Sequence, residues 1–106
     1  ATMVEFNFEE ASQTLFCKFD GRMDTVNADV AMEQFNAKLS EFQGIAATSR
    51  VVFDLGAVDY VASSFLRLCI FAAKGVPKGN FSIINTDPQV LKVFTITGLA
   101  SILRVT

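Results

Sequence analysis

Hydrophobic and polar side chains alternate in two short stretches near the start of the chain. The alternating apolar positions are Val4, Phe6 and Phe8 in the first stretch, and Leu15, Cys17 and Phe19 in the second. A period of two places successive side chains on opposite faces, which is typical of a strand with one buried face. The connection, residues 9–13, is short and mostly polar, so we expect the two strands to pair as an antiparallel hairpin.

Apolar residues then recur every three or four positions, which is the spacing of one helix face. These residues are Ala28, Met32, Phe35, Leu39 and Phe42. Residues 24–27 precede that face and offer side-chain oxygens that can accept hydrogen bonds from the first turn of a helix. Before these residues, Asp20 and Gly21 should end the second strand. Gly44 should end this helix.

A third strand is predicted over residues 51–55, where β-branched and aromatic side chains form a short apolar run. We expect this strand to lie inside the sheet. A loop and a helix over residues 63–74 should follow it, and Gly75 should end the helix. Ser63 and Ser64 stand at the helix start, where either side chain could cap the first turn. Partners and ligands of open α/β sheets meet the chain at such strand–helix junctions, so this junction is the candidate functional site.

The helix predicted over residues 63–74 is apolar on nearly all sides. We expect one stripe to face the core: Leu66, Cys69, Ile70 and Ala73. The opposite stripe is also apolar: Phe65, Leu68, Phe71 and Ala72. Such a helix is either buried on two sides or part of an interface. We therefore expect Phe65 to be partly exposed, at the centre of an apolar patch that includes Leu68.

The remaining elements follow from turn and cap residues. Residues 81–84 form an apolar strand, and Asp87 followed by Pro88 is typical of a helix start. Gly98 should end that helix, and residues 102–105 are predicted as a last short strand. The expected architecture is a single α/β domain over residues 1–106 with a mixed sheet, helices packed on it, and the order β-β-α-β-α-β-α-β.

Composition narrows the range of functions. The chain has 106 residues, a net charge of −2 and no histidine. Histidine is the commonest general base and metal ligand, and no phosphate-binding glycine loop is present, so we expect no enzyme, cofactor or metal. Without a basic cluster or a long apolar run, neither nucleic-acid binding nor a membrane span is expected. Cys17 and Cys69 lack a Cys-x-x-Cys spacing and are predicted as free core thiols of a cytoplasmic protein.

Three segments of the chain resemble the STAS family, the domain shared by anti-sigma-factor antagonists and the tails of sulphate transporters. They are residues 19–24 (FDGRMD), 54–66 (DLGAVDYVASSFL) and 94–99 (FTITGL). The segments follow one another in the family's order and span most of the chain. The resemblance implies a single STAS-like domain with the mixed sheet described above.

The resemblance also implies a regulator of transcription that works by partner switching. In such antagonists a kinase-like anti-sigma factor phosphorylates the first of two adjacent serines, and that position is Ser63 here. The unphosphorylated form binds the anti-sigma factor and releases the sigma factor. An aspartate that matches Asp24 lies near the partner-binding surface in the family. The partner-binding residues are thus expected to be Asp24, Ser63, Ser64, Phe65 and Leu68.

Two residues depart from the family pattern at the predicted phosphorylation site. Ala62 stands where the family has an aspartate before the serines, and Phe65 where it has a glycine after them. Ser63 as a phosphorylated residue and Ser63 as a plain helix cap therefore remain alternative predictions. A homodimer formed through the apolar patch is also open. A second class of function, a subunit of a lipid or anion transport system, would be favoured by a basic or apolar cavity.

Overall fold

The computed structural model describes residues 3–41 and 49–106. Within them the elements are β1 (Val4–Glu9), β2 (Thr14–Asp20), α1 (Thr25–Glu41), β3 (Arg50–Ala57), α2 (Ser63–Lys74), β4 (Phe81–Ile84) and α3 (Pro88–Ile96). The predicted mixed α/β class is confirmed. Gly44 and Phe42, which we expected at the end of the first helix, lie outside the described residues. No helix in the described part of the chain is both long and apolar enough to cross a bilayer.

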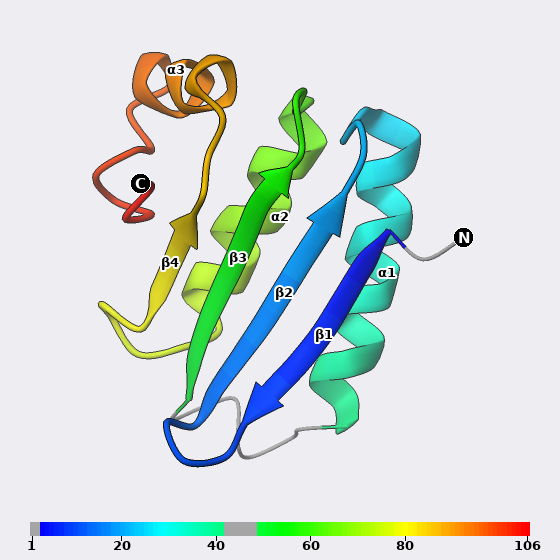
Figure 1. Ribbon diagram of the computed structural model, residues 1–106, viewed down its shortest axis with the longest axis vertical. Coiled ribbons are helices and arrows are strands. Elements are labelled where there is room, and N and C mark those ends of the chain that lie inside the picture. The colour runs from blue at the N-terminus through cyan, green and yellow to red at the C-terminus, as the bar shows by residue number, and fades with distance from the viewer. Residues whose placement is uncertain (1–2, 42–48) are drawn as a thin grey trace.

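The four strands form one sheet in the order β1-β2-β3-β4. β1 and β2 pair antiparallel as predicted, while β2–β3 and β3–β4 are parallel, so residues 51–55 lie in an inner strand. Cys17 is opposite Phe53, and Phe53 is opposite Ile83, which aligns three apolar side chains across the sheet. Helices α1 and α2 cover the same face of this sheet, and α3 follows at the end of β4 (Figure 1).

The core between the sheet and these two helices is built around phenylalanine rings. The ring of Phe53 lies with its centroid 4.6 Å from that of Phe19, 5.0 Å from Phe81 and 5.5 Å from Phe35. Phe35 and Phe53 are buried, as predicted from the helix and strand patterns. Cys17 and Cys69 are free and buried, also as predicted, and burial raises the pKa of both thiols.

Helix α2 faces the core with a different stripe from the predicted one. Its buried residues are Phe65, Leu68, Cys69 and Ala72, whereas Leu66, Ile70 and Ala73 are only partly buried. Both stripes of this helix are apolar, so helical periodicity did not determine which of them would face the sheet. Phe71 is 46% exposed and is the large apolar side chain that α2 presents to solvent.

The last predicted strand is present only as an isolated bridge between Val105 and Ile83. Residues just before Val105 form local turns instead, because the amide of Leu103 donates to the carbonyl of Leu99 and that of Arg104 to Ser101. Arg104 also has a φ of 51°, in the left-handed region, which is incompatible with an extended strand. The cap chemistry before α3 is as predicted, since the side chain of Asp87 accepts a hydrogen bond from the Gln89 amide.

Candidate functional site

The N-termini of α1 and α2 are held together by the loops that precede them. Met23 and Val61, both buried, form a parallel bridge between residues 21–24 and residues 57–62. The Met23 amide donates to the carbonyl of Tyr60 at 2.9 Å, and the Ala62 amide donates to the carbonyl of Met23 at 2.8 Å. The chain therefore brings two of the three family-like segments to one end of the helical layer.

Asp24 is the N-cap residue of α1. Its carboxylate accepts a hydrogen bond from the Asn27 amide at 2.9 Å, and its carbonyl accepts one from the Ala28 amide at 2.8 Å. The prediction that residues 24–27 supply the cap is thus confirmed. The Asp24 side chain is half-buried. It therefore caps α1 and is still partly accessible from the surface.

Helix α2 begins without a side-chain cap, and the prediction that Ser63 or Ser64 caps it is wrong. Its N-cap residue is Ala62, with an extended backbone at φ −91° and ψ 168°, and no side-chain cap hydrogen bond is present there among the described residues. Both serines already lie inside the helix, where their hydroxyls are poorly placed to reach the free amides. Ser63 is exposed, whereas the hydroxyl of Ser64 is buried without a hydrogen-bond partner among the described residues.

Arg22 and Tyr60 add a charged and an aromatic group to this surface. The guanidinium carbon of Arg22 lies 3.8 Å from the centre of the Tyr60 ring, which is a cation–π contact between the two loops. Both side chains are exposed. Arginine and tyrosine are enriched among residues that dominate binding energy, so the pair is suited to contact a partner. Sequence reasoning missed it because the contact depends on the Met23–Val61 bridge, between residues far apart in the chain.

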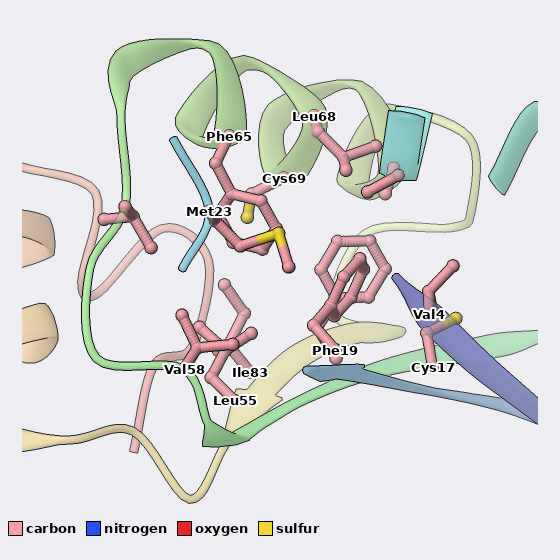
Figure 2. Close-up of a cluster of buried hydrophobic side chains, with 14 of the residues drawn as sticks. Val4, Cys17, Phe19, Met23, Leu55, Val58, Phe65, Leu68, Cys69 and Ile83 are labelled. Atoms are coloured by element: carbon pink, nitrogen blue, oxygen red, sulfur yellow. The ribbon is translucent and has the colours of Figure 1, made fainter. Parts of the chain in front are cut away.

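The expected exposed patch at Phe65 and Leu68 does not exist. Both side chains are 0% exposed, and both point from α2 into the core (Figure 2). The Phe65 ring packs edge-on against Phe19, with centroids 5.1 Å apart. A benzyl side chain buries far more apolar area in this layer than it could at the surface, so the helix turns this residue inward. Phe65 and Leu68 are therefore core residues, and their assignment to the partner surface is corrected.

Residues 5–106 match the family model described as the STAS domain, and the chain belongs to this family. Among curated proteins, the chain is 31% identical over 104 residues to BtrV of Bordetella bronchiseptica, which is named as an anti-sigma factor antagonist. That match covers 96% of this chain and 85% of BtrV.

Solved structures agree in fold. A STAS domain protein from Planctomyces limnophilus, described as an anti-sigma-factor antagonist, superposes with a TM-score of 0.80 at 21% identity, covering 100% of this chain and 91% of that one. The Bacillus cell-fate determinant SpoIIAA, solved in its phosphorylated form, superposes with a TM-score of 0.64 at 20% identity, covering 97% and 90% of the two chains. The arrangement of sheet and helices is thus that of anti-sigma-factor antagonists.

Proposed function

We propose that this protein is a non-enzymatic regulator that binds a protein partner through the α1–α2 surface. This surface comprises Asp24 and Ser63, together with Arg22 and Tyr60; Ser64 lies beside them with its hydroxyl buried. Phosphorylation of Ser63 switches the binding off, and the partner is a kinase-like anti-sigma factor. The observation that carries the proposal is the exposed Ser63 in the uncapped first turn of α2, held next to the N-terminus of α1. The names of the relatives support the same class of function.

A phosphate on Ser63 is compatible with the folded domain. The first turn of α2 has no side-chain cap, so its amide groups and the helix dipole favour an anion at this position. Ala62 leaves no acidic side chain directly before the serine. The effect of phosphorylation is therefore expected in binding, because nearly two negative charges in a packed interface must be desolvated. SpoIIAA, which has the same fold, has been solved in both unphosphorylated and phosphorylated forms.

The departure at Phe65 is less disruptive than the sequence indicated. A glycine at this position would leave space around the helix start, whereas a phenylalanine on the surface would obstruct it. Because the Phe65 ring is buried against Phe19, it does not project toward a partner that approaches Ser63. The exposed side of the first turn of α2 is therefore available for contact.

The proposal is tested by incubating the protein with a kinase-like anti-sigma factor of its source organism and ATP. We expect phosphate to appear on Ser63 by mass spectrometry, and Ser63→Ala to abolish it. Ser63→Asp should weaken binding to the anti-sigma factor by about tenfold or more, which is about 1.4 kcal/mol. Ser40→Asp is the matched control, because Ser40 is exposed on α1 and well along that helix from Asp24. If Ser63→Asp binds as tightly as the parent and Ser40→Asp, the switch at Ser63 is wrong.

One observation favours a second function, that of a subunit of a lipid or anion transport system. A groove at the other end of α2 combines an apolar wall with three cationic side chains. A cavity of this type is the feature that would distinguish a carrier of small ligands from a protein that only binds a partner.

A further inference from the structure

A groove of about 930 Å³ lies between the C-terminal part of α2, the loop to β4 and the segment that follows α3. Figure 1 shows that the C-terminal segment runs beside β4. The residues that line the groove come from α2, from the loop to β4 and its first residue, and from this segment. Its apolar wall is formed mainly by Ile70, Ala73, Val76, Phe81, Leu99 and Ile102. Ligand sites of small molecules typically occupy about 300–1,000 Å³ and are mostly apolar with a few polar groups, which is the character of this groove.

The polar groups along the groove are predominantly cationic. Lys74, Lys78 and Arg104 line it, and none of the described residues that line it is acidic. None of the ion pairs between described residues involves these three side chains. The net charge of the whole chain is −2, yet residues 61–106 contain a single acidic residue, Asp87. The groove is therefore a positively charged site on an acidic protein, and it suits an anionic ligand.

The backbone of Arg104 is fixed by hydrogen bonds of both its amide and its carbonyl. Its φ of 51° is unfavourable for a residue other than glycine, and it is fixed by a hydrogen bond from the Ile83 amide to the Arg104 carbonyl at 3.2 Å. Its guanidinium lies over Gly79, where an added Cβ would be 3.3 Å from Nη2 of Arg104. The absence of a side chain at position 79 therefore leaves room for the arginine fork, which is well suited to phosphate.

Ile102 is the most exposed apolar side chain of the groove. It is 73% exposed, although it belongs to the apolar wall. An apolar ligand group in the groove would cover the Ile102 side chain and remove it from water, which is favourable. A ligand with an apolar part as well as an anionic group therefore suits the groove better than a purely ionic one.

We propose that the groove binds a single-chain phospholipid with a phosphate monoester head, that is, a lysophosphatidate. The acyl chain lies along the apolar wall and contacts Ile102, while the phosphate is bound by Arg104 and the two lysines. Nearly two negative charges on a phosphate monoester match three cations better than the single charge of a fatty acid. A choline head would bring a positive charge into the same site. The inference concerns the end of α2 opposite Ser63 and stands independently of the proposed phosphoswitch.

The test is calorimetric titration of the protein with 1-oleoyl lysophosphatidic acid below its micelle concentration. We expect saturable binding of one lipid per chain, and binding at least about tenfold weaker for oleoyl lysophosphatidylcholine, which has the same chain. Glycerol 3-phosphate, which has the head without the chain, should not bind detectably. Ser63→Asp should leave lipid binding unchanged, so failure of the phosphoswitch and failure of the lipid site are distinguishable.

Variants with matched controls identify the site. Arg104→Gln and Ile102→Ser should each weaken lysophosphatidate binding by about tenfold. Lys92→Gln and Ile96→Ser remove the same kinds of side chain from exposed positions on α3 outside the groove, and they should bind as the parent does. Arg104→Gly suits the left-handed backbone, so it should lose binding while its melting temperature stays at or above that of Arg104→Gln.

Several results would overturn the inference. They are equal affinity for the choline lipid, no saturable binding of lysophosphatidate, or equal losses in the groove variants and in their controls. A fourth is a dimer in sedimentation that Ile102→Ser converts to monomer, because the groove would then be occupied by a second copy of the chain.

Discussion

The buried Phe65 provides the sharpest test of how this domain uses its departure from the STAS pattern. The ring is 0% exposed, and its centroid lies 5.1 Å from that of Phe19, at an interplanar angle of 88°, and 6.5 Å from that of Phe53. Phe65→Ala removes this ring from the layer between α2 and the sheet. Phe19 and Phe53 are held by their strands, so the space can close only in part.

The expected cost follows from these contacts. Truncating a buried phenylalanine to alanine destabilises a protein by about 3–5 kcal/mol, which includes the lost transfer free energy and the remaining cavity. Because aromatic contacts to both neighbours are lost as well, we expect a value of about 4 kcal/mol. The total stability of a domain is about 5–15 kcal/mol, so the variant should still fold, but its Tm should fall by roughly 15–30 °C.

The measurement is equilibrium unfolding in guanidinium chloride followed by circular dichroism, with partner affinity measured on the same preparation. Phe71→Ala is the matched control, because Phe71 lies on the same helix but is 46% exposed, and we expect it to cost about 1 kcal/mol. Affinity per folded molecule should be unchanged in Phe65→Ala, since the ring does not reach the surface. A loss of stability below about 1 kcal/mol, or a fall in affinity without a fall in stability, would refute the assignment of Phe65 to the core.

Three further predictions concern the helix cap and the thiols. Asp24→Ala should lower the free energy of unfolding by about 1 kcal/mol, because the Asn27 amide loses its acceptor. Asp24→Asn should cost much less, because an asparagine side chain can still accept this hydrogen bond. Equal losses of stability in the denaturation curves of the two variants would contradict the cap. Burial raises the pKa of Cys17 and Cys69, so neither thiol should react with iodoacetamide at pH 8 until the protein unfolds, and a modified native protein in mass spectra would count against this. Because unfolded thiols lose their protons near their ordinary pKa of 9.0 while the folded ones keep them, stability should also fall as the pH rises above that value.

Local chemistry in the sequence was sufficient to predict most elements of this fold. The alternation in β1 and β2 follows from the geometry of a single strand, and the caps at Asp24 and Asp87 depend on amides only two or three residues away. The inner position of β3 was predictable because its short run of β-branched and aromatic residues is typical of a strand within a sheet. Such signals are contained within a few neighbouring residues, so they can be recognised without the rest of the molecule.

The tertiary structure decided what depends on residues far apart in the chain. Both stripes of α2 are apolar, and only packing against Phe19 and Phe53 determined that Phe65 faces inward. The Met23–Val61 bridge, which brings Asp24 and the serines to one surface, joins segments that carry no local sign of their pairing. The same is true of Arg104 above Gly79 in the groove. Contacts of this kind form only when the whole core closes, because the free energy that stabilises them comes from burial of the complete apolar layer.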